Sequence, residues 1–192
     1  MAVADFDAIV RRIEQLVTPV LIGIDGLPCS GKSTLADRLE RHFAIETISL
    51  DDFVYPESQW PRDARPAFPF EYIRYDEFVR MVETLALTGT ATHVPFDWTT
   101  FEPAAVPRTV RLDRLALVEG VSALTPVLAP LYGLRIFVES DRSTTMEAAL
   151  ARGVGQGAEL WRDLFMPSAD LYMLTGPQSR ADLIFRGRGA EN

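Results

Sequence analysis

Short apolar segments alternate along the chain with longer amphipathic segments. The apolar segments have the length of buried strands, whereas apolar residues in the amphipathic segments recur every three or four positions, as on one face of a helix. Regular alternation of this kind is typical of an α/β fold, in which helices cover a parallel sheet in three layers and the crossovers are right-handed. The five strands expected on this basis lie at residues 20–24, 46–50, 115–118, 134–138 and 182–185.

Two of the expected helices have recognisable ends. The first carries apolar residues from Phe6 to Val17 and ends before Pro19, because proline cannot continue a helix. A later helix stops at Gly89, since glycine readily adopts the left-handed conformation of a helix end. The inward face of this later helix is expected to consist of Phe78, Met81, Val82, Leu85 and Leu87.

Three stretches interrupt the alternation. Residues 55–70 contain four prolines, which exclude a regular helix or a central strand, so we expect a long surface loop that is either functional or simply a solvated connection. Residues 91–98 and 106–112 indicate two short strands joined by an aromatic loop. The glycine-rich segment 153–157 is expected to be a hinge.

The composition is that of a single globular domain, with 47% hydrophobic and 24% charged residues and no apolar run long enough to span a bilayer. A net charge of −8 argues against binding nucleic acid polymers through a broad basic surface. Cys29 is the only cysteine, which excludes an internal disulfide and a zinc site built on cysteines. His42 and His93 have no second ligand at metal-binding spacing, and His93 is expected to be an ordinary strand residue. The acidic N-terminus lacks the features of a secretory signal, so we expect a cytoplasmic protein with no membrane partner.

One segment, GLPCSGKS, fits the phosphate-loop pattern G-x-x-x-x-G-K-[ST] at every fixed position. An apolar strand precedes it and an amphipathic helix follows it, so its glycines can curl the backbone around a phosphate at the positive end of the helix dipole. We expect a polyphosphate such as ATP, with Lys32 contacting the β- and γ-phosphates and Ser33 binding the accompanying Mg²⁺. The expected nucleotide-binding residues are Gly26, Leu27, Pro28, Cys29, Ser30, Gly31, Lys32, Ser33 and Thr34.

Carboxylates follow two of the expected strands. Asp51 and Asp52 come after the second strand, and Glu119 comes after the third. Ligands of an open parallel sheet bind at the carboxyl ends of its strands. Because consecutive strand residues point to opposite faces, only one of Asp51 and Asp52 should point into the site unless the strand has already ended.

These motifs resemble a known family, the P-loop small-molecule kinases of the uridine kinase and phosphoribulokinase group. The resemblance implies a single kinase domain over residues 1–192, with a five-stranded sheet in the order 2-3-1-4-5, an acceptor-binding excursion at about 52–112 and a lid at about 142–170. Besides the loop, the similar segments are ISLDDF at 48–53, PFD at 95–97, LALVEG at 115–120, LRIFVES at 134–140 and ADLIFRG at 181–187.

The resemblance also implies catalytic and metal-binding roles. Asp51 would be the base that takes the proton of the acceptor hydroxyl, and Lys32 and Arg152 would be catalytic cations. Ser33 and Glu119 would hold Mg²⁺, although a helix cap or a surface carboxylate is the alternative for Glu119.

The same resemblance places the acceptor next to the excursion. Asp76 would bind ribose hydroxyls, although an N-cap role fits it equally well. Trp98 and Phe101 add rings that could stack on a planar group, but Thr100 and Phe101 stand where uridine kinases have a histidine. The residues expected to bind the acceptor are Asp52, Asp76, Phe96, Asp97 and Trp98.

The arginine-rich lid of the family is reduced in this chain. Of its arginines only Arg152 is kept, so either Arg142 or Arg162 compensates or the transition state is less well stabilised and turnover is slow. A reduced lid would also suit an ATP-binding regulatory protein with weak transfer activity.

The function predicted from the sequence is ATP- and Mg²⁺-dependent transfer of a phosphate to a hydroxyl of a small molecule, with uridine or cytidine as the leading acceptor. An alternative within the same chemistry is a pantothenate-like compound or a sugar phosphate. Arg62, Arg65 and Arg74 could bind the anion of such an acceptor.

Overall fold

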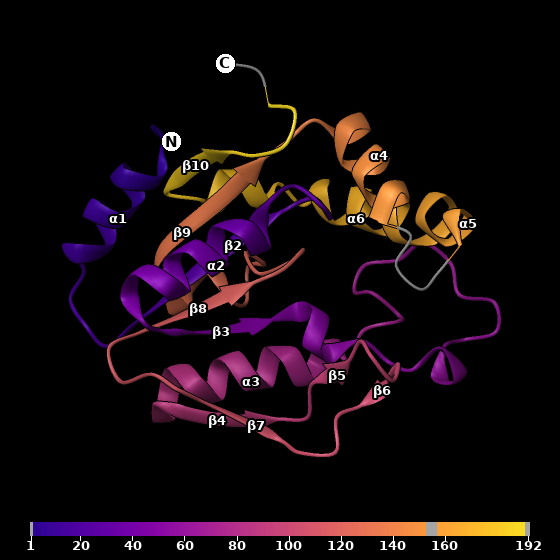
Figure 1. The fold of residues 1–192 in the computed structure, drawn as a ribbon, viewed down its shortest axis with the longest axis horizontal. Coiled ribbons are helices and arrows are strands. Elements are labelled where there is room, and N and C mark those ends of the chain that lie inside the picture. The colour runs from indigo at the N-terminus through magenta and orange to yellow at the C-terminus, as the bar shows by residue number, and fades with distance from the viewer. Residues whose placement is uncertain (1, 153–156, 191–192) are drawn as a thin grey trace.

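The computed structural model of the chain describes residues 2–152 and 157–190, apart from the side chain of Arg152. At its centre is a parallel sheet in the order β1-β10-β9-β2-β8-β3, with helices on both faces (Figure 1). The predicted α/β architecture is therefore confirmed. The strands of this sheet are β1 (Ala2–Ala4), β2 (Val20–Gly26), β3 (Glu46–Ser49), β8 (Leu115–Glu119), β9 (Tyr132–Glu139) and β10 (Leu183–Arg186).

The sheet has six strands rather than the five expected, so the predicted count is wrong. Numbered by their order along the chain, the five expected strands run 2-3-1-4-5, and the additional strand β1 pairs with β10 at the edge. The three residues of β1, Ala-Val-Ala, form too short a pattern to indicate a strand. Their extended conformation comes from backbone pairing, with Ala2 opposite Leu183, and not from local sequence preference.

Buried side chains form separate clusters on the two faces of the sheet. On one face, α1 (Phe6–Glu14) and α2 (Lys32–Phe43) pack against strand residues such as Ile22. On the other face, α3 (Tyr75–Thr88) packs in the cluster that contains Leu21. Neighbouring residues of β2 thus belong to opposite cores, as the two-residue period of a strand requires.

Helix α3 ends where the sequence predicts, but its inward face is smaller than expected. Gly89 follows the helix with a φ of 75°, and its N–H donates to the carbonyl of Leu85. Of the five residues predicted to face inward, four are buried and Leu87 is 86% exposed. Two positions correspond to roughly 200° of rotation along a helix, so Leu87 faces away from Leu85.

Among the described residues, three helices follow β9 in the part of the chain where a lid is expected. A wide helical turn, Trp161–Phe165, joins the second of them to the third. Residues 153–156 of the predicted hinge lie outside the described residues. In the described part of the chain, no helix combines the length and the apolar character needed to cross a bilayer. The three helices are α4 (Arg142–Arg152), α5 (Ala158–Leu160) and α6 (Met166–Met173).

Two small antiparallel ribbons extend the α3 side of the molecule. β4 (Thr90–His93) pairs with β7 (Arg108–Arg111), and β5 (Phe96–Asp97) pairs with β6 (Glu102–Pro103). The strand expected at 91–98 is therefore divided into β4 and β5, and β5 pairs with β6 from the expected aromatic loop. β5 lies beside the turn that follows β3, at the carboxyl edge of the sheet (Figure 1).

Candidate active site

The predicted phosphate loop lies between β2 and α2. Gly26 and Gly31 have φ angles of 149° and 107°, in the range that favours glycine. A Cβ on Gly26 would lie 2.5 Å from the carbonyl oxygen of Val138, so a larger residue would have to displace β9. Lys32 is buried, and its Nζ donates to the carbonyl of Leu27 at 2.8 Å. The loop thus places a buried ammonium group where it can offset the charge of a phosphate.

A buried carboxylate lies beside the loop. Glu119 ends β8, and its Oε1 accepts hydrogen bonds from Ser49 Oγ at 2.8 Å and from Ser33 Oγ at 3.4 Å. Burial raises the pKa of Glu119 to about 7, although the positive charge of Lys32 lowers this pKa and the negative charge of Asp51 raises it further. Because Glu119 is buried in a strand, the alternatives of a helix cap and a surface carboxylate are wrong.

Ser33 and Glu119 fit a Mg²⁺ site that is shared with a bound nucleotide. Mg²⁺ prefers oxygen ligands and usually combines one or two protein groups with waters and substrate phosphates. A dication beside Glu119 would favour its ionised form. Among residues 2–152 and 157–190, no group of three or more His, Cys, Asp and Glu side chains is placed to hold a metal ion. A metal bound by Ser33 and Glu119 would therefore take further ligands from phosphate and water.

Asp51 and Asp52 lie in a tight helical turn, Leu50–Phe53, because β3 has already ended at Ser49. Strand alternation therefore does not decide which of them enters the site. Asp51 lines a cavity next to the phosphate loop. The carboxylate of Asp52 instead forms a hydrogen bond with the ring of His93, with Oδ2 2.8 Å from Nε2. The structure thus gives Asp52 a partner within the protein and leaves it outside the cavity lining.

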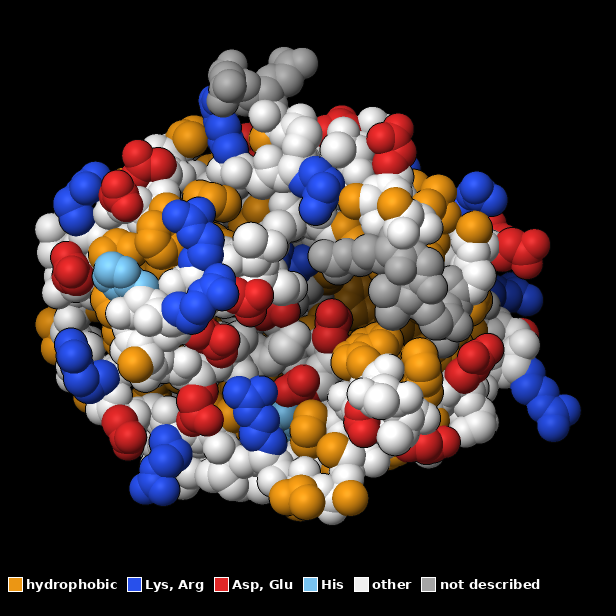
Figure 2. All heavy atoms as spheres, viewed as in Figure 1, with side chains coloured by type: hydrophobic (Ala, Val, Ile, Leu, Met, Phe, Trp, Pro, Cys, Tyr) orange, Lys and Arg blue, Asp and Glu red, His pale blue; other side chains and the backbone are white. Residues whose placement is uncertain are grey.

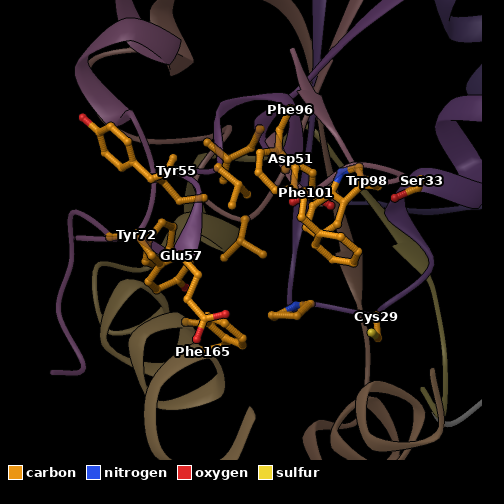
Figure 3. A pocket seen from close by; sticks show the side chains of 18 of the residues that line it. Cys29, Ser33, Asp51, Tyr55, Glu57, Tyr72, Phe96, Trp98, Phe101 and Phe165 are labelled. Atoms are coloured by element: carbon orange, nitrogen blue, oxygen red, sulfur yellow. The ribbon is translucent and has the colours of Figure 1, made fainter. Parts of the chain in front are cut away.

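The cavity has a volume of about 630 Å³. In the space-filling view it is a hollow with hydrophobic side chains inside and carboxylates at its edge (Figure 2). In close-up, Ser33 of the phosphate loop lies on one side, Tyr55 and Phe165 lie on the other, and Asp51 lies between them (Figure 3). The cavity therefore connects the phosphate loop with a second wall, and a carboxylate lies between the two.

Aromatic side chains form a large part of the cavity lining. The ring centroids of Tyr72 and Phe165 are 4.8 Å apart, as are those of Phe96 and Trp98. Phe96 and Trp98 thus lie at the cavity, as the sequence predicts. The rings that line it belong to Tyr55, Trp60, Phe70, Tyr72, Phe96, Trp98, Phe101, Trp161 and Phe165.

The charged groups around the cavity are mostly acidic. In the described part of its lining, Lys32 is the one cation, and the carboxylates are those of Asp51, Glu57, Glu102 and Glu119. Lysine and arginine are the side chains that best bind a phosphate group. Away from the phosphate loop, the cavity therefore suits a neutral or cationic group better than an anionic one.

Two other residues predicted to bind an acceptor lie outside the cavity lining. Asp76 is exposed in the first turn of α3, and the N-cap of that helix is Arg74, so the N-cap alternative is wrong. Asp97 accepts the backbone N–H of Thr99 at 2.8 Å, which lowers the pKa of its carboxyl group. The Asp97 side chain thus stabilises the turn between β5 and β6.

Two of the arginines proposed for the lid or for an anion have structural partners, and the side chain of a third lies outside the described part. The side chain of Arg152 is not among the described residues. Arg142 binds Asp170 of α6, with Nε 2.8 Å from Oδ1. Arg74 binds Glu77 through Nη1 at 2.9 Å and two backbone carbonyls through Nη2. Arg142 and Arg74 therefore join elements of the protein.

A buried carboxylate behind the loop escaped the sequence-based prediction. Asp25 Oδ1 accepts the N–H groups of Gly26 and Ser122, and Oδ2 accepts the N–H of Leu124 and the hydroxyl of Tyr172. Burial raises the pKa of Asp25, whereas these hydrogen bonds lower it. Asp25 thus joins the phosphate loop, the segment after β8 and α6. The available signal was a charged residue inside an otherwise apolar strand.

The chain matches no protein-family profile, but it is similar in sequence to known kinases. It is 26% identical over 146 residues to a uridine kinase from Clostridium perfringens, which covers 72% of this chain and 70% of that protein. It is 26% identical over 188 residues to uridine-cytidine kinase B from Dictyostelium discoideum, and the alignment covers 91% of this chain and 76% of that protein. It is also 27% identical over 145 residues to the tRNA-specific adenosine deaminase subunit tad2 from Schizosaccharomyces pombe, where it spans only 34% of that protein.

Solved structures show the same fold. A possible uridine kinase from Bacillus stearothermophilus aligns with a TM-score of 0.73 at 20% identity, covering 94% of this chain and 96% of that one. Phosphoribulokinase from Rhodobacter spheroides aligns with a TM-score of 0.61 at 16% identity, and the alignment covers 90% of this chain and 71% of that one. The resemblance to the uridine kinase and phosphoribulokinase group of P-loop kinases, predicted from the motifs, is thus confirmed.

Proposed function

We propose that this protein is an ATP- and Mg²⁺-dependent kinase that transfers the γ-phosphate to a hydroxyl of a small molecule. The observation that carries this proposal is one cavity in which Asp51 stands between Ser33 of the phosphate loop and an aromatic wall (Figure 3). A phosphate donor at the loop and an acceptor at the wall would meet at a carboxylate. The kinases to which the chain is similar support the same chemistry.

Four polar residues of the cavity take part in the proposed reaction. Lys32 would contact the phosphates of ATP, and Ser33 and Glu119 would hold the metal. Mg²⁺, when bound, offsets the negative charge of the transferring phosphoryl group. Asp51 accepts the proton of the acceptor hydroxyl as the hydroxyl oxygen bonds to the γ-phosphorus. The bond from that phosphorus to the bridging oxygen of ADP breaks, and ADP leaves with the electron pair.

A nucleoside such as uridine or cytidine is the acceptor that the cavity supports best. Phe96, Trp98 and Phe101 offer ring faces or edges on which a planar base can pack. Two similar proteins are named as kinases of these nucleosides, which supports the same choice. Thr100 and Phe101 stand where uridine kinases have a histidine. Aromatic packing, and not a hydrogen bond from a histidine, would therefore select the base.

A sugar phosphate or a pantothenate-like anion fits the cavity less well. Such an acceptor would place a second negative charge among the lining carboxylates, and like charges at close range repel. Arg62 and Arg65 are exposed and are not among the lining residues, and Arg74 already binds Glu77. The charges of the cavity thus favour an unphosphorylated acceptor.

The adjacent carboxylates Asp51 and Asp52 provide the test of the proposed function. Asp51→Asn keeps the shape but removes the base, so kcat should fall on the order of 10²-fold or more, while the Kd for MgATP stays nearly unchanged. Asp52→Asn, which alters a residue outside the cavity, should lower kcat much less. Steady-state turnover and ATP titrations of both variants would measure the difference.

The pattern of losses separates the alternatives. If Asp52→Asn loses most of its kcat and Asp51→Asn turns over almost normally, Asp52 and not Asp51 is the base. If neither substitution changes turnover, the kinase mechanism loses its main support. An ATP-binding regulatory protein with weak transfer activity would then be the better interpretation.

A further inference from the structure

His93 connects the ribbon of β4 and β7 to the turn that carries Asp51. It ends β4, and its side chain is 1% exposed. Its ring stacks on that of Phe53, with centroids 4.9 Å apart and planes at 18°. The same ring places Nε2 2.8 Å from Oδ2 of Asp52. His93 therefore contacts two consecutive residues of the Leu50–Phe53 turn, one by packing and the other by a hydrogen bond.

Other contacts hold the backbone of this turn. Arg74 donates from Nη2 to the carbonyl of Asp52 at 2.8 Å and from its backbone N–H to the carbonyl of Phe53 at 2.7 Å. Arg108 approaches the Asp52 carboxylate less closely, with Nη1 3.6 Å from Oδ2, and its side chain is 39% exposed. The backbone of the turn thus depends on Arg74, whereas the orientation of the Asp52 side chain depends mainly on His93.

We propose that His93 is a positioning residue for phosphoryl transfer: it fixes Asp52 and thereby keeps the adjacent Asp51 directed into the cavity. This inference rests on the proposed function, because it takes Asp51 as the base. Asp51 and Asp52 are consecutive in one short turn, so a rotation of the turn that moves one carboxylate also moves the other. His93 itself touches neither ATP nor the acceptor, because it is not among the residues that line the cavity.

Loss of the His93 hydrogen bond should reduce turnover more than binding. A misplacement of about 1 Å can cost on the order of 10²-fold in rate, because proton transfer requires close alignment of the two groups. Since Arg74 still holds the backbone of the turn, we expect a smaller loss, about tenfold in kcat. The Kd for MgATP and the KM of the acceptor should change by less than about twofold, because the phosphate loop and the aromatic wall are untouched.

The substitution His93→Phe tests this inference because it keeps a ring for packing on Phe53 and removes both ring nitrogens. His93→Gln, which can still offer an N–H to Asp52, should recover part of the lost kcat. His42→Phe is the matched control, since His42 is exposed on α2 outside the cavity lining, and it should leave kcat unchanged. Thermal unfolding of each variant shows whether a change in kcat only follows a loss of stability.

A double-mutant cycle distinguishes positioning from a general structural role. If His93 acts through Asp51, His93→Phe should lower kcat about tenfold in the wild type and have almost no effect in the Asp51→Asn background. An equal loss in both backgrounds would overturn the inference. Should His93→Phe fail to fold, His93→Gln and Asp52→Asn, which keep polar side chains, take its place in the cycle with Asp51→Asn. A loss of kcat in the wild type that is absent in the Asp51→Asn background supports the inference, and an equal loss in both overturns it.

The outcomes also separate this inference from the proposed function. If Asp51→Asn loses most of its kcat and every His93 variant has a normal kcat, the positioning role is wrong and the kinase mechanism stands. If Asp51→Asn turns over normally, the proposed base is wrong, and with it the role of His93.

Discussion

The two ends of the cavity are built in different ways. The phosphate end is formed largely by one contiguous segment, residues 28–34, in which Gly31 and Lys32 are adjacent in the sequence. The aromatic end is assembled from residues 54–60, 70–73, 96–102 and 161–169, which meet only in the folded chain. The phosphate end is therefore suited to a donor shared by many kinases, and the aromatic end to one acceptor. Substitutions at the two ends should have separable effects.

The largest separable effect is expected for Lys32→Ala. Removing an ammonium group that contacts phosphate should weaken MgATP binding on the order of 10²-fold, since a hydrogen bond to a charged group is worth about 1.5–3 kcal/mol. The loss should be the same for every acceptor. Calorimetry measures it, with Arg41→Ala, an exposed cation on the same helix, as the control. Equal MgATP affinity in Lys32→Ala and the wild type would contradict the assignment of the phosphate loop as the nucleotide-binding site.

Glu119→Gln should have the next largest effect. It replaces an ionisable ligand by a neutral amide, so turnover should fall on the order of tenfold or more and require a higher Mg²⁺ concentration. Binding of ATP without metal should change less, because the lost contact is with Mg²⁺. Turnover measured against Mg²⁺ concentration tests this. The same Mg²⁺ dependence in both proteins would assign Glu119 a structural role.

At the aromatic end, Trp98→Ala should raise the KM of the acceptor about tenfold, because stacking of a base on an aromatic ring is worth about 1–3 kcal/mol. MgATP affinity should not change. Leu87→Ala is the control, since Leu87 is also large, apolar and exposed but lies on the outer face of α3. A parallel loss of MgATP affinity in Trp98→Ala would show that the two ends of the cavity are not independent.

The smallest expected effect concerns stability. Burial raises the pKa of Glu119 from 4.5 to about 7, so the folded state binds more protons than the unfolded state between these values. The free energy of unfolding therefore falls as pH rises through this interval, by on the order of 3 kcal/mol at most. Glu119→Gln lacks this contribution, so its stability relative to the wild type should increase from pH 5 to pH 8. Denaturant titrations that show the same difference at both pH values would contradict the burial of an ionisable group.

The difference between the two ends also explains what the sequence could predict. The strand, the loop and the helix around Lys32 follow from local patterns, because glycine conformation and hydrophobic period are properties of short segments. Glu119 could be placed beside the loop because the carboxyl ends of parallel strands share one edge. The phosphate end and the sheet were therefore largely predictable.

The rest depends on contacts between distant segments. Nothing local to Tyr55 or Phe165 indicates that they form one wall, and the exposed position of Asp76 follows from where the N-terminus of α3 lies relative to the cavity. The partnership of Asp52 with His93 joins residues 41 positions apart, and that of Asp25 with Tyr172 joins residues 147 apart. Such pairs follow from packing of the whole chain and leave no periodic signal.

The most direct test of the central claim is phosphorylation itself. Wild-type protein would be incubated with MgATP and either uridine, cytidine or uridine 5′-monophosphate, and the products identified by mass spectrometry alongside ADP release. We expect one phosphate to be added to a neutral nucleoside, with little or no transfer to the monophosphate. Binding of MgATP without acceptor-dependent release of ADP, for these and a wider set of hydroxyl compounds, would contradict the claim that the cavity joins a phosphate donor to an acceptor.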